Sequence, residues 1–261
     1  MFKRIKLSKR QRFSASALIL SVGLLLLQWV PLDYRYLGIL LLGFITYGMS
    51  AFALLEDLKG IEWYTILVLP TMYAVSVSLF YFLLPENFLS RLLIVSLFGV
   101  GMYTLFLTEN IFSVAAARTI QLVRAAHAVG FLMTLLTLML LYNTLFSLHW
   151  PFYLNGLAAF VVTLPAFIQG LWFIKLDNKL DPAVVKMSAG ISYAIALLAI
   201  GLSFVPVTVW VASLFLATAV YVGLGLLQHA LNDRLFEQTI YEYVGVGAFV
   251  FIATLVVTQW K

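Results

Sequence analysis

Apolar residues fall in long, nearly uninterrupted runs along this chain, and polar residues gather between the runs. A helix needs roughly 20 apolar residues to cross a hydrocarbon core about 30 Å thick, and about 17 to 25 are tolerated. Nine segments meet this length: Phe13–Val30, Tyr36–Leu55, Trp63–Leu84, Leu92–Thr108, Ala125–Phe146, Phe152–Ile174, Met187–Val205, Val207–Leu227 and Tyr243–Trp260. The pattern predicts an all-α, polytopic transmembrane helix bundle of about nine spans.

Only Val205, Pro206 and Val207 separate the seventh run from the eighth. A single helix from Met187 to Leu227 would be roughly 60 Å long, which is twice the hydrocarbon thickness. We therefore expect two spans joined by a tight hairpin at Pro206.

Composition supports a lipid solvent, since 63% of the residues are hydrophobic and 10% are charged. The formal net charge is +5, but six of the sixteen basic residues lie in the first twelve positions, which is typical of a topology signal and not of nucleic-acid binding. The first apolar run has no convincing signal-peptide cleavage site, so we expect a retained helix. The predicted organisation is a basic cytoplasmic N-terminus at 1–12 and one transmembrane helical domain at 13–260.

The distribution of Lys and Arg among the loops predicts the orientation. With the N-terminus in the cytoplasm, thirteen of the sixteen basic residues fall inside: Lys3, Arg4, Lys6, Lys9, Arg10, Arg12, Lys59, Arg118, Arg124, Lys175, Lys179, Lys186 and Arg234. Only Arg35, Arg91 and Lys261 fall outside. A cytoplasmic N-terminus is therefore predicted.

The nine assigned spans contain no Asp, Glu, Lys or Arg. This weakens a proton-coupled transporter and an intramembrane hydrolase, because both need ionisable groups at bilayer depth. A channel or a lipid pathway remains a possible function. Such a route could use the backbone groups exposed where Pro70, Pro165 and Gly245 break the third, sixth and ninth helices. These three spans also leave open a triplicated three-helix unit.

Sequence motifs for catalysis or cofactor binding are missing. There is no GxxxxGK[ST], GxGxxG, HExxH or GxSxG, and without cysteine there is no thiolate metal site or disulfide. No cofactor and no metal are predicted.

A polar ridge follows the fourth span, where Arg118, Gln121, Arg124 and His127 recur every three residues and Glu109 can pair with either arginine. One interpretation is an amphipathic helix at the lipid headgroups. The other is an anion or partner site, in which the arginines bind phosphate or carboxylate groups and His127 lies just inside the bilayer. Both stay open.

The stretch TENIFSVAAARTIQLVRAAHAVGF at 108–131, together with the loop-poor helical plan, resembles uncharacterised multi-pass membrane proteins of bacteria. The resemblance implies a bacterial inner (plasma) membrane protein. It carries over no activity and no site residue.

Two further polar sets have structural explanations. His229, Asp233 and Glu237 share a helical stripe, but the first and last lie about 12 Å apart along the axis, which is too far for one metal ion. A solvated helix end is the favoured interpretation. Amide and aromatic side chains near the outer boundary suit an interfacial belt more than a ligand vestibule; they are Gln28, Trp29, Asn143, His149, Trp150, Tyr153 and Asn155.

The leading functional hypothesis from sequence is a non-enzymatic assembly or accessory component that binds a protein partner on its cytoplasmic face. It would present the Arg118–Arg124 ridge and the loop at 228–242, since the spans are free of charge. A transporter, channel or lipid-handling protein is the alternative, and a membrane-boundary enzyme is the third. The lipid bilayer is the one partner predicted outright, and the oligomeric state stays open.

Overall fold

The computed structural model is helical throughout its described part, which comprises residues 8–55, 58, 60–84, 87–117, 122–176 and 179–258. Helices account for 86% of the residues, and no strand occurs in these ranges. Within them, nine helices are long and apolar enough to cross a membrane. The prediction of an all-α chain with about nine spans is confirmed.

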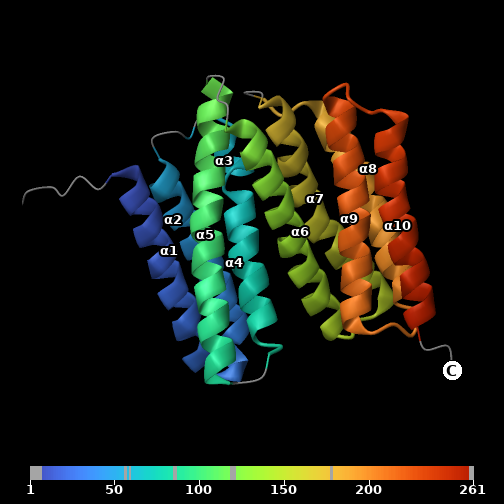
Figure 1. Cartoon of the computed structure of the whole chain (residues 1–261). Helices are drawn as coiled ribbons and strands as arrows, with labels where there is room; N and C mark the ends of the chain where they lie inside the picture. Colours follow the sequence, from blue (N-terminus) through green and yellow to red (C-terminus); the bar gives the residue numbers. More distant parts are fainter. Residues whose placement is uncertain are drawn as a thin grey trace, which may run out of the picture. The chain divides into compact units, whose positions relative to one another are not determined.

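The chain divides into two compact units, Met1–Ala126 and His127–Lys261. We call them the N-terminal unit and the C-terminal unit, and each is described by itself. Within each unit the long helices run alongside one another in Figure 1.

The N-terminal unit is built on four long helices that pack as a ring. Its elements are α1 (Lys9–Leu26), the 3₁₀ turns η1 (Leu27–Trp29) and η2 (Leu32–Tyr34), α2 (Arg35–Leu54), α3 (Glu62–Thr65), α4 (Val68–Tyr81) and α5 (Phe88–Ala117). Helix α1 packs on α2 and α5, and α4 packs on the same two helices. Short connections make neighbouring helices antiparallel, so the four enclose one interior.

Small residues bring these helices together. Gly99 of α5 lies against Ser21 of α1, and Gly101, half a turn further, lies under the ring of Tyr73 of α4. Tyr73 also donates a hydrogen bond to the carbonyl of Leu97 (3.3 Å). Because lipid tails give helices no hydrophobic reason to associate, close approach at small residues and such hydrogen bonds hold the ring.

The C-terminal unit contains α6 (Val123–Ser147), α7 (Phe152–Lys175), α8 (Pro182–Leu202), α9 (Val209–Leu231) and α10 (Glu237–Val257). Helices α7 and α8 pack most extensively, α9 packs on both, and α10 packs on α9. The connection between α8 and α9 contains Pro206, so the predicted hairpin between the seventh and eighth spans is confirmed.

Polar side chains tie α6 to its neighbours. The hydroxyls of Tyr142 and Thr163 lie 2.5 Å apart between α6 and α7, and the amide of Asn143 donates to Ser213 of α9 (3.4 Å). Tyr142, Asn143, Thr163 and Ser213 are all buried. Since hydrocarbon offers no competing hydrogen bonds, each pair satisfies groups that would otherwise be costly to bury.

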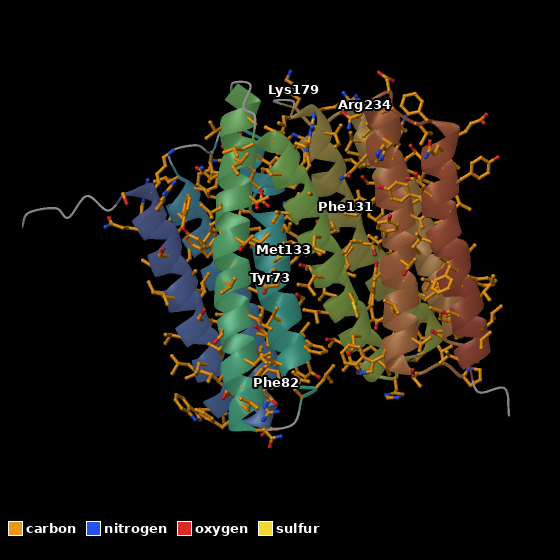
Figure 2. The ribbon with its side chains drawn as sticks, viewed as in Figure 1. Tyr73, Phe82, Phe131, Met133, Lys179 and Arg234 are labelled. Carbon is orange, nitrogen blue, oxygen red and sulfur yellow. The ribbon has the colours of Figure 1, made fainter. Side chains whose placement is uncertain are left out.

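Among the described residues of the C-terminal unit, formal charge is confined to one end. Its described Asp, Glu, Lys and Arg residues all lie at the α7–α8 and α9–α10 connections or within two turns of them: Lys175, Lys179, Asp181, Lys186, Asp233, Arg234, Glu237 and Glu242. Lys179 and Arg234 mark this end in Figure 2. The connections at 148–151 and 203–208 carry no formal charge.

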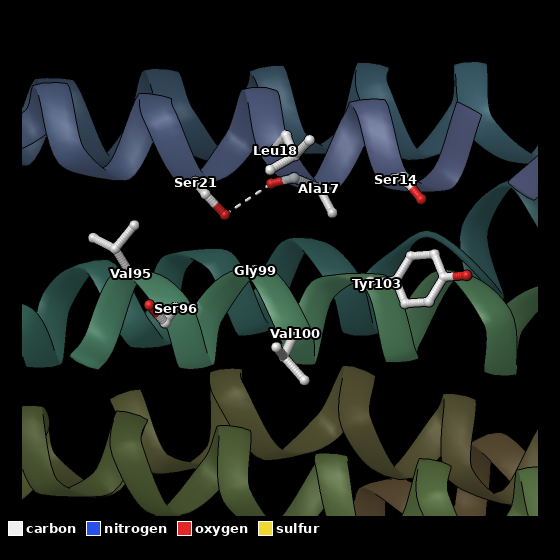
Figure 3. A pocket seen from close by; sticks show the side chains of 9 residues that line it. All are labelled: Ser14, Ala17, Leu18, Ser21, Val95, Ser96, Gly99, Val100 and Tyr103. Carbon is white, nitrogen blue, oxygen red and sulfur yellow. Dashed lines mark hydrogen bonds between the residues drawn. The ribbon is translucent and has the colours of Figure 1, made fainter. Parts of the chain in front are cut away.

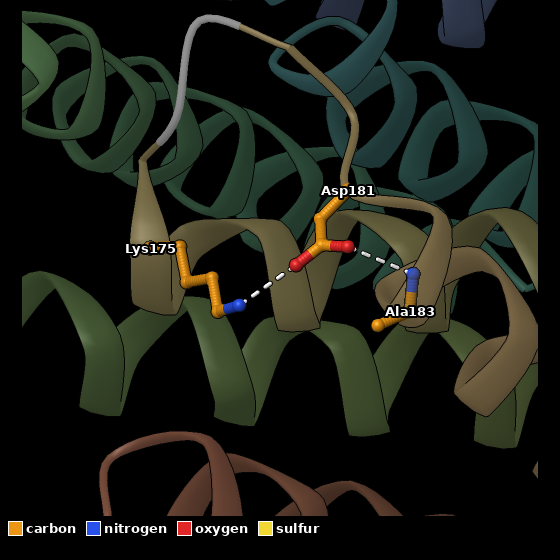
Figure 4. A network of polar contacts seen from close by, with 3 residues as sticks. All are labelled: Lys175, Asp181 and Ala183. Carbon is orange, nitrogen blue, oxygen red and sulfur yellow. Dashed lines mark hydrogen bonds and ion pairs between the residues drawn. The ribbon is translucent and has the colours of Figure 1, made fainter.

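An N-cap closes the α7–α8 connection. Asp181 accepts the backbone N–H of Ala183 (2.8 Å) at the start of α8, and its other oxygen pairs with Nζ of Lys175 (2.8 Å), as Figure 4 shows. These two contacts, that with Lys175 first, hold the pKa of the Asp181 carboxyl below its ordinary value. The cap fixes where α8 begins.

Helix α5 corrects one predicted boundary. The fourth span was expected to end at Thr108, but α5 continues to Ala117. Hydropathy alone ended the span at Glu109 because it treats a carboxylate as a surface group. Here Glu109 is fully buried, with no exposed surface, so the helix passes through it.

Candidate functional site

Three of the five residues in the predicted polar ridge lie in the described part of the chain. Glu109 is buried within α5, Arg124 is exposed in the first turn of α6, and His127 is half-buried. Nε2 of His127 lies 2.8 Å from the carbonyl oxygen of Phe173, near the end of α7, so this nitrogen donates to it. Arg118 and Gln121 fall outside the described residues.

Helical hydrogen bonding lapses at one point of the third span, a few residues before Pro70, whereas the sixth and ninth spans run on. Helix α3 ends at Thr65 and α4 begins at Val68, with Pro70 in the first turn of α4. Helix α7 runs on through Pro165, and α10 runs on through Gly245. Ile66 and Leu67, between α3 and α4, keep right-handed helical backbone angles, so the third span continues through this interruption of its hydrogen bonding.

Breaking the third span releases backbone carbonyls from helical pairing. Proline has no N–H, so the carbonyl of Ile66 has no helical donor at Pro70. The carbonyl of Trp63 accepts the hydroxyl of Tyr47 from α2 (3.0 Å) in place of a helical N–H. The short α3 is thereby attached to α2 by a side chain.

Two carboxylates lie near this interruption, and neither was expected to be buried, although Glu109 was predicted as part of the polar ridge. Glu62 opens α3 and is 5% exposed, and its Oε2 accepts the hydroxyl of Ser113 of α5 (2.9 Å). Glu109 lies one turn before Ser113 on α5. Glu62 and Glu109 lie just outside the spans assigned from hydropathy, and the helices of the structure extend to include them.

Helical register directs Glu109 into the interior of the ring. On α5, Gly101 meets α4 and Gly99 meets α1. Each residue of a helix turns about 100° around the helix axis, so Glu109 lies about 80° around α5 from Gly101. This places Glu109 on the arc between the side of α5 that faces α4 and the side that faces α1. That arc faces the space enclosed by α1, α2, α4 and α5.

Two serines line the same interior. Ser50 of α2 and Ser16 of α1 are fully buried, and neither hydroxyl has a hydrogen-bond partner among the described residues. Ser50 lies one turn after Tyr47, and Glu109 lies one turn before Ser113; Tyr47 and Ser113 are the residues that contact α3. Tyr47 and Ser113 thus attach α3 to α2 and to α5.

We define the interior polar cluster by its side chains, which come from four helices: Ser16, Ser50, Glu62, Glu109 and Ser113. Glu62, Glu109 and Ser113 take part in further interactions as well. Buried carboxylates are costly unless they are paired, and the hydrogen bond between Glu62 and Ser113 satisfies part of that cost, so this cluster is the strongest functional candidate in the described structure.

A family model for proteins of unknown function, DUF5656, matches residues 49–257. The chain belongs to the DUF5656 family. No curated protein and no solved structure matches it. The matched region includes Ser50, Glu62, Glu109 and Ser113, whereas Ser16 lies before it. The site of this DUF5656 protein is therefore argued from its own geometry.

The sequence did hold a signal for the missed carboxylates. Glu62 has Ile61 and Trp63 as neighbours, and an apolar run follows directly. Glu109 is followed by apolar residues at Ile111 and Phe112. Carboxylates set among apolar residues on both sides suggest burial, while the hydrogen bond to Ser113 depends on a contact between residues 51 positions apart.

The surface grooves of the N-terminal unit in this DUF5656 protein are mostly apolar, unlike the interior polar cluster. The groove in Figure 3 has about 560 Å³ between α1 and α5, and its lining is mostly apolar, with Ser14, Ser96 and Tyr103 at its edge. A second groove of about 490 Å³ lies between α2 and α4. Both open sideways from the ring, as expected for surfaces that contact lipid tails.

Metal binding by side-chain clusters is not supported. The described residues contain no group of three or more His, Cys, Asp or Glu side chains that could hold a metal ion. His229 directs Nδ1 at the carbonyl of Gly225 (2.9 Å), and Asp233 adopts a left-handed conformation (φ 53°) just after α9. Because α9 ends at Leu231 and Glu237 opens α10, His229, Asp233 and Glu237 do not share one helical stripe.

Proposed function

We propose that this DUF5656 protein is a membrane transport protein whose working site is the interior polar cluster. The observation that carries the proposal is the pair of buried carboxylates, Glu62 and Glu109, beside the break in the third span. Interrupted helices supply free backbone groups and a hinge in many transporters. Buried carboxylates supply charge that changes when a proton or cation binds.

The break also gives the third span a place to bend. Residues Ile66 and Leu67 separate α3 from α4, and α3 is fastened to α2 through Tyr47 and to α5 through Ser113. A change at Glu62 therefore acts directly on how α3 is held. The protonation state of the Glu62 carboxylate is thereby linked to the conformation at one end of the four-helix ring.

Reconstitution tests the proposal. The purified full chain is placed in liposomes and assayed for flux of protons, alkali cations, sugars and lipids under imposed gradients. We expect at least one gradient-dependent flux, and a loss of at least about tenfold in Glu109→Gln because the cluster then lacks one of its two carboxylates. Glu237→Gln, an exposed change in α10, is the matched control and should keep the flux.

Thermal unfolding of each variant separates loss of flux from loss of fold. A folded Glu109→Gln variant with wild-type flux would refute the role of the cluster. Absence of every flux in the wild type would refute the transport function for those solutes.

A second candidate is the assembly or accessory component, and the exposed rim after α9 favours it. Leu235, Phe236 and Tyr241 are 42%, 66% and 76% exposed, and they alternate with Arg234 and Glu237. Aromatic side chains among charges are common in protein interfaces. A photocrosslinker at Phe236 should capture one defined protein in native membranes, whereas capture of lipid alone would exclude this role.

We infer a cytoplasmic N-terminus and a bacterial inner membrane for the chain. The charged end of the C-terminal unit supports the orientation, since positive loops stay inside. The chain has no cysteine, so single cysteines report the side directly. Thr208→Cys should react with an impermeant maleimide in intact cells, and Lys179→Cys only after the membrane is opened. The opposite result would reverse the orientation.

A further inference from the structure

The groove between α1 and α5 has an apolar middle and a polar end. Leu18 of α1 and Val100 of α5 line its middle, and Ser14 and Tyr103 lie together at one end, as Figure 3 shows. The groove has a volume of about 560 Å³ and opens sideways from the four-helix ring. Its shape and lining suit one lipid tail.

Two contacts set the register of α1 against α5. Ser21 of α1 lies against Gly99 of α5, and the ring of Phe13 lies 6.1 Å from the ring of Phe106. The helices are therefore antiparallel, and each step back along α1 is matched by a step forward along α5.

This register brings Arg10 of α1 level with Asn110 of α5, beyond the polar end of the groove. Arg10 precedes Ser14 by about one turn and Asn110 follows Tyr103 by about two turns, so both stay on the groove side of their helices. Arg10 is exposed. The Oδ1 atom of Asn110 is buried and has no hydrogen-bond partner among the described residues. A cation and an amide thus lie at the head of an apolar groove.

Positive charge dominates this end of α1. Lys9 and Arg12 flank Arg10, the first turn of α1 has no acidic residue, and the chain has none before position 33. Glu109 precedes Asn110, but it is fully buried and lies about 100° around α5, toward the interior of the ring. Basic residues beside a membrane span attract anionic lipids. The head of the groove is therefore complementary to a negative headgroup.

We propose that the groove between α1 and α5 binds one anionic phospholipid, with an acyl chain along the groove and the phosphate at Arg10. Asn110 has N–H donors for the phosphate and an acceptor oxygen for a headgroup hydroxyl. The site lies outside the interior polar cluster and does not rest on the transport function.

Native mass spectrometry of the purified, delipidated full chain measures the binding. The chain in neutral detergent is titrated with phosphatidylglycerol or with phosphatidylcholine that has the same acyl chains. We expect one phosphatidylglycerol to bind saturably, at least about fivefold more tightly than phosphatidylcholine, because only the former has a net negative charge. Glycerol 3-phosphate has the charge without the tails and should not bind.

Variants test the head and the tail of the site separately. Arg10→Gln and Asn110→Ala should each weaken phosphatidylglycerol binding by about fivefold, the usual contribution of one cation near the surface or of one hydrogen bond. Val100→Trp fills the groove and should weaken the binding of both lipids. Lys186→Gln removes an exposed cation from α8 and is the matched control, which should bind as the wild type does. Thermal unfolding checks that each variant is folded.

Three results would overturn the site. Equal affinity for the two phospholipids, or wild-type affinity in a folded Arg10→Gln variant, would remove the headgroup contact. Glycerol 3-phosphate binding as tightly as phosphatidylglycerol would remove the acyl chain from the groove. Dimers that carry no lipid would assign the groove to a second copy of the chain.

Discussion

Gly101 offers the sharpest test of how the N-terminal ring is packed. It lies under the ring of Tyr73, which is 3% exposed and stacks on Phe98 at 5.6 Å with a 10° tilt. An alanine Cβ at this position would overlap the phenol oxygen and two ring carbons. The Gly101→Ala change therefore forces the Tyr73 ring to move.

The expected cost follows from these contacts. Displacing a packed ring costs about 1–3 kcal/mol, and losing its stack on Phe98 costs about 0.5–1.5 kcal/mol. Alanine in place of glycine returns about 1 kcal/mol through helix propensity. The net effect is a destabilisation of about 1–3 kcal/mol, which corresponds to about 2–4 °C in midpoint for each kcal/mol in a chain of this size.

Thermal unfolding by intrinsic fluorescence measures the effect in detergent, and Gly48→Ala is the matched control. Gly48 lies on α2 in the same unit, and a Cβ there would meet no atom within 4 Å. We expect Gly48→Ala to be neutral or stabilising by up to about 1 kcal/mol. If Gly101→Ala proved as stable as Gly48→Ala, the close approach of α4 and α5 at Tyr73 would be wrong.

Two further predictions concern the C-terminal unit. Asp181→Ala should lower the unfolding midpoint by about 1–3 °C at neutral pH by removing the N-cap of α8. Because Lys175 lowers the pKa of Asp181, the cap contributes above the ordinary pKa of 3.8 and is lost as pH falls below it, so the difference between wild type and variant should vanish in strong acid. Tyr142→Phe removes the hydroxyl that bonds Thr163 and should destabilise by about 0.6–1.7 kcal/mol. Tyr241→Phe, at an exposed ring, should leave the midpoint unchanged; equal midpoints for both variants would contradict the interhelical bond.

Hydropathy predicted the number and order of the spans because it measures a local property. A run of about 20 apolar residues is most stable as a helix that crosses the hydrocarbon core of a membrane. In that helix the backbone N–H and carbonyl groups bond to one another. Even the doubtful division at Pro206 followed from length alone. The helix ends were predicted less well, because they depend on which polar residues find partners inside the fold.

The interior polar cluster shows why the site could not be predicted. Glu109 was placed in a loop because an isolated carboxylate is costly in lipid. The fold places it on the interior arc of α5, one turn from Ser113, which bonds Glu62. That arrangement depends on the register of α5 against α3, and glycine contacts such as Gly101 with Tyr73 set it.

The same reasoning is the basis on which we propose transport ahead of the hypothesis drawn from the sequence. A charge-free set of spans made recognition at the membrane surface the better hypothesis. Glu62 and Glu109 lie inside helices long enough to span a membrane. An apolar or amide side chain would cost less free energy to bury there, so we look for a role that needs the carboxylate charge. The proposed transport function uses these buried carboxylates, whereas the scaffold hypothesis does not.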